Sequence, residues 1–213
     1  MIRIVIADDH AIVREGLKRI VSSAPDLELV AEAADGTEVM QRVRELQFDV
    51  LVLDLSMPGR SGMELIKLVK SEKPRLRILI LSMHQELQYA VRAIKSGASG
   101  YLTKESAPAQ LEQAIRKIAA GGAYISAEVA EQLALGAMPN AGAAAPHETL
   151  SDREFEVLRR LAAGESVSEI AAALKLSVKT VSTHKANGMA KMGLANQTEL
   201  VRYALKHGLI EDA

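Results

Sequence analysis

The sequence has 213 residues, contains no cysteine or tryptophan, and is only 3% aromatic. Without cysteine the chain can form no disulfide and offers no thiol chemistry. No apolar run approaches the length of about 20 residues that a membrane span needs. The N-terminal apolar run, Ile2–Ala7, is also too short for the apolar region of a signal peptide. We therefore expect a cytoplasmic protein with no membrane contact.

One apolar run without alternation, Val50–Leu53, ends in Asp54 and is followed by the turn residues Pro58, Gly59 and Gly62. Such a run indicates a strand that is buried on both faces of a parallel sheet. Ligands bind at the carboxyl ends of the strands in open α/β sheets, so Asp54 lies where a reactive side chain is expected. The alternative is a capping residue that merely follows a strand.

A second acidic cluster, Asp8 and Asp9, follows the first apolar strand. In the flavodoxin-like strand order 2-1-3-4-5, strands one and three are neighbours, which brings Asp8, Asp9 and Asp54 together. Three carboxylates raise each other's pKa unless a cation intervenes, and oxygen ligands without cysteine favour Mg²⁺. His10 could also be a metal ligand, but we expect it to cap the next helix instead.

Two further strand ends complete the predicted pocket. Ser82 ends the apolar run that begins at Arg77, and Lys104 follows the run Ser99–Thr103. A carboxylate nucleophile, a Mg²⁺ site, a hydroxyl and an ammonium are the groups needed to transfer a phosphoryl group and hold the product.

Segments of strand and helix character alternate through the first 120 residues. This alternation predicts an α/β doubly wound fold with a right-handed parallel sheet and helices on both faces. In the last of these helices we expect Ser106 as the N-cap and Pro108 in the first turn. The strands are expected at 2–7, 27–33, 50–54, 77–82 and 99–103, and the helices at 10–23, 36–46, 61–72, 86–96 and 106–120.

Residues of about 1–120 resemble a response-regulator receiver domain. The resemblance implies that a sensor histidine kinase phosphorylates Asp54, and that Asp9 and Asp54 bind Mg²⁺ directly. It also implies that Asp8 helps to bind the ion through water and Ser56 through its backbone carbonyl. The matching residues are Asp8-Asp9, the stretch 54–62 in its Asp-Leu-x-Met-Pro-x-x-x-Gly form, Ser82, Tyr101 and Lys104.

The same resemblance assigns the other residues of the pocket. Ser82 and Lys104 would hold the phosphoryl oxygens, and Tyr101 would swing inward behind Ser82. That movement would shift the surface of the neighbouring helix 86–96 and so act as a two-state switch.

The alternation of strand and helix segments ends at Gly121. Residues 126–135 read as a short amphipathic helix, and Gly136–Pro146 reads as a flexible tether of small residues with two prolines and no charge. A binding loop is the alternative for the tether. We therefore predict a receiver domain at 1–121, a linker at 122–148 and a third segment at 149–213.

The sequence pattern of residues 149–213 predicts four short helices with a tight turn between the second and third. This arrangement is typical of a helix-turn-helix unit. A small helical bundle without a ligand is the alternative. The helices are predicted from their N-terminal residues: the capping boxes Ser151 with Glu154 and Ser166 with Glu169, the cap Ser177, and Asn196 with Glu199.

Lysines without any opposing acid occur between Ile170 and Thr198, which favours contact with the phosphates of double-stranded DNA. Val178, Val181 and Met192 share the inward face of the third helix. The candidate DNA-binding residues are Lys179, Thr180, Ser182, Thr183, Lys185, Ala186, Asn187 and Lys191.

Residues of about 150–210 resemble the LuxR-type helix-turn-helix, in the motif that begins Leu150-Ser151-x-Arg153-Glu154 and in Thr180-Val181. The whole chain is thus similar to response regulators of the NarL/FixJ family. Gly188 departs from the family, which usually has an apolar core residue there. Glycine costs about 1 kcal/mol against alanine inside a helix, so we predict a locally weak recognition helix.

The expected function is that of a transcription regulator that forms a homodimer when phosphorylated and binds two half-sites about one helical turn apart. A phosphatase that also uses a strand-end aspartate is one alternative. Such enzymes need a second aspartate two residues on as the general acid, and Ser56 occupies that position. We therefore expect no enzyme activity beyond slow self-dephosphorylation. The other alternative, DNA binding independent of phosphorylation, is disfavoured by the acidic pocket.

Overall fold

The computed structural model describes residues 1–57, 62–83, 87–136 and 145–210. By their internal contacts they form two compact units, Met1–Leu133 and Ala134–Ala213. The turn predicted at 58–61 and most of the predicted tether, residues 137–144, lie outside the described residues.

The first unit is built on a five-stranded parallel sheet with the predicted order, β2-β1-β3-β4-β5. Both faces of its central strands are covered, which explains why their sequences show no alternation of apolar and polar residues. The strands are β1 (Ile2–Ala7), β2 (Leu27–Ala33), β3 (Val50–Asp54), β4 (Arg77–Ser82) and β5 (Gly100–Thr103).

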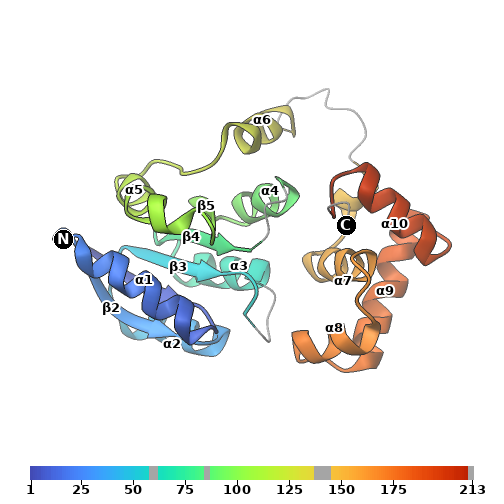
Figure 1. Cartoon of the computed structure of the whole chain (residues 1–213), viewed down its shortest axis with the longest axis horizontal. Coiled ribbons are helices and arrows are strands. Elements are labelled where there is room, and N and C mark those ends of the chain that lie inside the picture. The colour runs from blue at the N-terminus through green and yellow to red at the C-terminus, as the bar shows by residue number, and fades with distance from the viewer. Residues whose placement is uncertain (58–61, 84–86, 137–144, 211–213) are drawn as a thin grey trace. The chain divides into compact units, whose positions relative to one another are not determined.

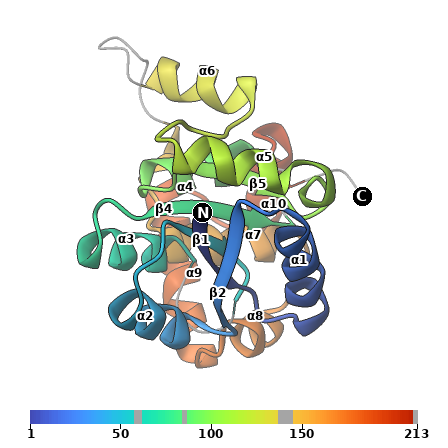
Figure 2. The ribbon, with the colours of Figure 1, turned by 90° about the vertical axis from the view of Figure 1, so that its left-hand side faces the viewer.

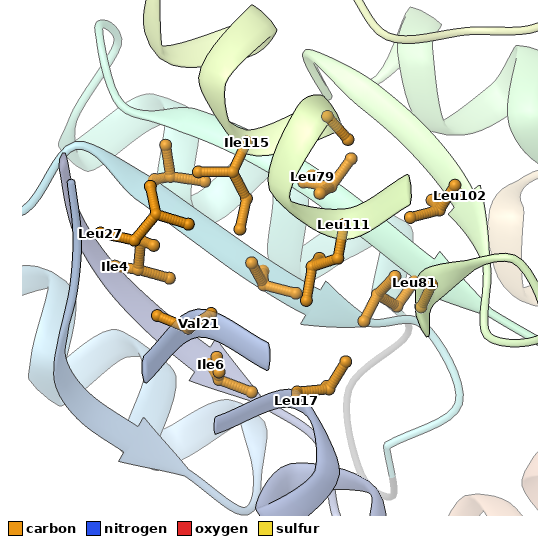
Figure 3. Close-up of a cluster of buried hydrophobic side chains, with 14 of the residues drawn as sticks. Ile4, Ile6, Leu17, Val21, Leu27, Leu79, Leu81, Leu102, Leu111 and Ile115 are labelled. Carbon is orange, nitrogen blue, oxygen red and sulfur yellow. The ribbon is translucent and has the colours of Figure 1, made fainter. Parts of the chain in front are cut away.

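Helices cover both faces of this sheet (Figures 1 and 2). α1 (Ala11–Ser23) and α5 (Ala107–Ala119) pack on one face, and α2 (Gly36–Glu45), α3 (Gly62–Glu72) and α4 (Leu87–Lys95) lie on the other. The core beneath α1 and α5 contains Leu17, Val21, Leu111 and Ile115 from the helices and Ile4, Ile6, Leu79 and Leu81 from alternate strand positions (Figure 3).

Pro108 lies in the first turn of α5 as predicted, but Ser106 does not cap this helix with its side chain. A capping residue needs an extended backbone so that its hydroxyl can reach the next amides. Ser106 instead has a helical backbone, with φ −80° and ψ −17°, and its Oγ lies 2.8 Å from Thr103 Oγ1. Ser106 is therefore the N-cap residue, as predicted, but its side chain makes no capping hydrogen bond.

The chain after α5 returns to the edge of the sheet, which the sequence pattern did not predict. The Tyr101 amide donates to the Tyr124 carbonyl (2.8 Å), and the Tyr124 amide donates to the Ser99 carbonyl (3.1 Å). A Cβ atom on Gly100 would lie 3.0 Å from the Tyr124 carbonyl oxygen, so this pairing depends on glycine at position 100. α6 (Ala127–Gly136) follows, and its Val129 packs against α4.

In the second unit the described residues form helices joined by short loops, and all four predicted helix starts are confirmed. In α7 and α8 both hydrogen bonds of each capping box are present. At the starts of α9 and α10, the side chains of Ser177 and Asn196 accept hydrogen bonds from backbone amides. The elements are a 3₁₀ turn, η1 (Pro146–Thr149), and the helices α7 (Asp152–Ala162), α8 (Val167–Leu174), α9 (Val178–Met192) and α10 (Gln197–Lys206).

Among the described residues, no helix combines the length and apolar character needed to cross a membrane.

Candidate functional site

Three side chains from three strand ends meet at the carboxyl edge of the sheet. Asp8 follows β1, Asp54 ends β3, and Lys104 follows β5. The Lys104 Nζ lies 2.6 Å from Asp8 Oδ2 and 2.8 Å from Asp54 Oδ2. Both aspartates are buried. The backbone explains this convergence, because β1 and β5 flank the central pair β3 and β4 in a sheet whose strands all run parallel.

The pocket holds more buried carboxylates than ammonium groups. Burial raises the pKa of the Asp54 carboxyl, and the hydrogen bonds from Lys104 and the Ser56 amide offset only part of that effect. Burial alone would lower the pKa of Lys104, but hydrogen bonds to Asp54 and Asp8 outweigh it and raise the pKa. One ammonium is therefore shared by two buried carboxylates, and the pocket retains excess negative charge that a cation would neutralise.

Asp9 and His10 lie on the solvent side of the same pocket. The Asp9 side chain is 28% exposed and the His10 side chain 64% exposed. His10 Nδ1 lies 2.9 Å from Asp9 Oδ1, and its side chain makes no capping hydrogen bond to α1. His10 is therefore the N-cap residue of α1, as predicted, but its imidazole contacts the neighbouring carboxylates instead of the helix amides. Asp8, Asp9, His10 and Asp54 each offer one ligand atom within 4.8 Å of the others.

The residues after Asp54 shape the rim of the pocket. The Ser56 amide donates to Asp54 Oδ1 (3.0 Å), which orients the carboxylate. A Cβ atom on Gly62 would lie 2.8 Å from both the Cα and the carbonyl oxygen of Leu55. Glycine at position 62 is therefore needed for α3 to begin against the backbone beside Asp54.

Ser82 and Tyr101 come from β4 and β5. Ser82 is fully buried at the end of β4, and its carbonyl accepts the Lys104 amide (2.8 Å). Tyr101 is half-buried and lines a cavity of about 530 Å³ together with Leu87, Tyr124 and Val129. The predicted switch tyrosine therefore shares its surroundings with the segment that follows α5, an association that no local sequence pattern indicates.

The predicted DNA-binding residues all lie on α9, where they differ in exposure and in their partners. Lys185 and Thr180 are half-buried, and the Thr180 Oγ1 lies 2.8 Å from Ser177 Oγ. Lys191 is exposed, but its ammonium lies 2.7 Å from Oε2 of the buried Glu154 on α7. The remaining predicted residues are exposed: Lys179, Ser182, Thr183, Ala186 and Asn187.

One sequence-based expectation about α9 needs correction, and one residue has a role that the sequence did not indicate. Val178 was expected to face inward but is 51% exposed, because it is the first residue of the helix and extends beyond the core formed around Val181. Gly188 was predicted to make the recognition helix locally weak, which stays a prediction. A Cβ atom there would lie 2.8 Å from Leu158 Cδ1, so α7 and α9 approach each other closely at a glycine that has no room for a side chain.

Comparisons with known proteins place both units in one family. Residues 4–116 match the response regulator receiver domain, and residues 148–204 match the bacterial regulatory proteins of the luxR family. The chain therefore belongs to the two-component response regulators that combine a receiver with a LuxR-type helix-turn-helix, as in the NarL/FixJ group. This is a family of transcription factors rather than catalytic enzymes.

Particular relatives extend along nearly the whole chain. The oxygen regulatory protein NreC of Staphylococcus aureus is 42% identical, over 98% of this chain and 99% of that protein. A structure of the RcsB response regulator of Salmonella typhimurium is 31% identical, with a TM-score of 0.71, and the match covers 97% of this chain and 98% of that one. A LuxR-family response regulator from Aurantimonas sp. is 44% identical with a TM-score of 0.58, over 62% of this chain and 94% of that one.

Proposed function

We propose that Asp54 accepts a phosphoryl group from a sensor histidine kinase, and that this modification controls DNA binding by α9. The observation that carries the proposal is the contact of Lys104 with both Asp8 and Asp54, which brings a cation to a buried carboxylate nucleophile. A carboxylate oxygen of Asp54 would attack phosphorus while the bond from phosphorus to the kinase histidine nitrogen breaks and the imidazole leaves.

The residues of the pocket suit a Mg²⁺ ion. Asp8, Asp9 and Asp54 would hold it with the Ser56 carbonyl, because their carboxylate oxygens gather within 4.8 Å of one another and carboxylate and carbonyl oxygens are the ligands that Mg²⁺ prefers. When bound, Mg²⁺ supplies charge neutralisation at the phosphoryl oxygens. Lys104 would move from its present carboxylate partners to a phosphoryl oxygen, and the Ser82 hydroxyl would donate to another.

Phosphorylation of Asp54 would alter the structure outside the pocket by moving Tyr101. Ser82 drawn toward the phosphoryl group would vacate space for the Tyr101 ring, which now lines the cavity beneath Tyr124 and Val129. The loss of that ring would alter the packing of the segment 122–133 on β5 and α4. The proposed signal thus reaches the chain that connects the receiver to the DNA-binding unit.

The proposed partner of α9 is double-stranded DNA, read by a homodimer. One structure describes RcsB of Salmonella enterica bound to promoter rprA in the presence of the phosphomimetic BeF₃⁻, and another describes two RcsB dimers bound to two parallel DNAs. For this chain, the exposed residues Lys179, Ser182 and Thr183 would meet the major groove. Thr180, Lys185, Ala186 and Asn187 stay predicted DNA-binding residues, and a cytoplasmic location stays a prediction. Lys191 was predicted with them, but its ammonium contacts Glu154, and for this residue we propose a structural role.

Acetyl phosphate and Mg²⁺ provide the test. Wild-type protein should become labelled to about one phosphoryl group per chain and then bind DNA upstream of its own gene more tightly, whereas Asp54→Ala should do neither. Continuous release of phosphate would support a phosphatase instead. Equal DNA affinity of labelled and unlabelled protein would contradict phosphorylation control.

A further inference from the structure

Arg14, a residue of α1, contacts the backbone of the loop that carries Asp8 and Asp9. Its Nη1 donates to the carbonyl oxygen of Asp8 (2.6 Å), six positions earlier in the chain. The side chain is only 19% exposed, so water competes little for this bond. Hydrogen bonds from a charged donor are shorter and stronger than those between neutral groups. The guanidinium therefore fixes the peptide group that joins Asp8 to Asp9.

A carboxylate on the edge strand β2 orients the guanidinium. Arg14 Nε lies 3.5 Å from Glu32 Oε2, and Lys18 Nζ lies 3.3 Å from Glu32 Oε1. Both cations come from α1, and Glu32 is paired with Ile6 in the register of β2 and β1. Arg14 thus connects a carboxylate on β2 to the backbone carbonyl of Asp8, where β1 has just ended.

The peptide that Arg14 holds determines how the pocket carboxylates are presented. On the other side of the same loop, the His10 amide donates to Asp8 Oδ1 (2.8 Å) and the His10 carbonyl accepts the Arg14 amide (3.0 Å). A peptide group is planar, so its rotation changes ψ of Asp8 and φ of Asp9 together. Such a rotation would break the bond to Arg14 and move the Asp9 carboxylate relative to that of Asp54.

We propose that Arg14 is a positioning residue for the phosphorylation of Asp54: its bond to the Asp8 carbonyl holds the Asp9 carboxylate at the pocket before an ion is bound. Glu32 acts through Arg14. The inference rests on the proposed function and extends it to a residue of α1. Binding to a loop that is already ordered costs less free energy, so Arg14 increases the affinity of the pocket for Mg²⁺. At saturating Mg²⁺ the loop is ordered with or without Arg14, and the rate of phosphorylation should depend little on it.

Arg14→Met removes the guanidinium and keeps an unbranched apolar side chain. In labelling by acetyl phosphate, the Mg²⁺ concentration that gives half the maximal rate should rise by about tenfold, while the rate at saturating Mg²⁺ changes by less than about threefold. Lys18→Met removes the other cation from Glu32 without touching Asp8, and should behave as the wild type does. An unchanged Mg²⁺ requirement in Arg14→Met, or a slow rate that persists at saturating Mg²⁺, would overturn the proposal.

Hydrogen exchange in EDTA tests the same role without an ion. The His10 amide should exchange about tenfold faster in Arg14→Met than in the wild type or Lys18→Met, whereas the amides of Ile6 and Val52 should not change. Equal acceleration at all three amides would mean that Arg14 merely stabilises the fold, which would contradict the proposal. Failure of the wild type to become labelled would contradict the proposed function itself. Normal labelling of the wild type together with wild-type behaviour of Arg14→Met would contradict only the role of Arg14.

Discussion

Lys104 Nζ lies 2.8 Å from Asp54 Oδ2, although 50 positions of sequence separate the two residues. The ammonium occupies the side of the carboxylate that faces Asp8, where it neutralises charge that a divalent ion would also neutralise. Lysine and metal therefore compete electrostatically for the same carboxylates, even though both are needed once a phosphoryl group is present.

This competition predicts that Lys104→Met binds Mg²⁺ more tightly than the wild type does. Removal of the ammonium leaves two buried carboxylates to be neutralised by the ion alone, so we expect affinity to rise by about tenfold, which corresponds to about 1.4 kcal/mol. Calorimetry measures the affinity. Lys18→Met removes a half-exposed lysine from α1 and serves as the control. A weaker Mg²⁺ complex in Lys104→Met would show that Lys104 organises the site instead.

The raised pKa of Asp54 predicts a pH-dependent effect of its replacement. A carboxyl whose pKa is higher in the folded protein than its ordinary value of 3.8 binds more protons when folded, so its contribution to stability falls as pH rises through that interval. In EDTA, Asp54→Asn should therefore melt at a higher temperature than the wild type at pH 7.5. The difference should shrink on acidification and close near pH 3.8. A difference that grows on acidification would contradict the sign, and thermal melts across this range measure it.

The sequence predicted the strands and the pocket residues because both depend on features that are local in the chain, while the strand order was taken from the flavodoxin-like fold. Unbroken apolar runs mark buried strands, and each pocket residue directly follows such a run, as Asp54 and Lys104 do. The pairing of Tyr124 with β5 and the close approach at Gly188 depend on contacts between distant segments. No periodicity encodes them, and the same glycine that signals a weak helix also permits two helices to touch.

A side chain added at Gly188 should overpack the contact between α7 and α9. An alanine would gain about 1 kcal/mol of helix propensity but lose about 1–3 kcal/mol to the clash with Leu158, for a net loss of up to about 2 kcal/mol. Gly16→Ala, in α1 where an added Cβ meets nothing within 4 Å, should instead gain about 1 kcal/mol. Chemical denaturation measures both.

A smaller side chain at position 158 should relieve the clash that an alanine at position 188 creates. In the double variant Gly188→Ala with Leu158→Val, the free energy of unfolding should exceed the value expected from adding the two single losses. Strict additivity would mean that Leu158 moves aside without cost and that the approach of α7 to α9 is loose.

The two lysines of α9 should behave differently on DNA. Lys179 is exposed on the first turn, so Lys179→Ala should reduce the slope of log affinity against log salt by about one. Lys191 contacts Glu154, so Lys191→Ala should leave that slope nearly unchanged. The variant should lose about 1–3 kcal/mol of stability, because it leaves the buried Glu154 carboxylate without its partner.

The pH dependence distinguishes these roles further. Burial alone would raise the pKa of Glu154, but the bonds from Lys191 and Ser151 outweigh it and lower the pKa. The stability that Glu154 contributes is therefore present above its ordinary value of 4.5 and is lost as pH falls below it. The stability gap between the wild type and Lys191→Ala should narrow in acid. A gap independent of pH, or a salt slope reduced by one, would make Lys191 a DNA contact.

The pairing of Tyr124 with β5 predicts how phosphorylation is felt beyond the pocket. In Gly100→Ala the added methyl group would meet the Tyr124 carbonyl oxygen at 3.0 Å and its Cβ at 3.1 Å, which should displace the segment from the sheet edge. The Tyr101 amide donates to that carbonyl, so its hydrogen exchange should accelerate by about tenfold, a change of about 1.4 kcal/mol in local opening. Exchange of the β1 and β3 amides should stay the same.

If Tyr101 loosens this segment when it turns inward, wild-type protein treated with acetyl phosphate and Mg²⁺ should show the same acceleration at Tyr101 and Tyr124, and Asp54→Asn should not. Acceleration in Gly100→Ala but not in phosphorylated protein would mean that the segment is held by Gly100 and yet is not part of the switch.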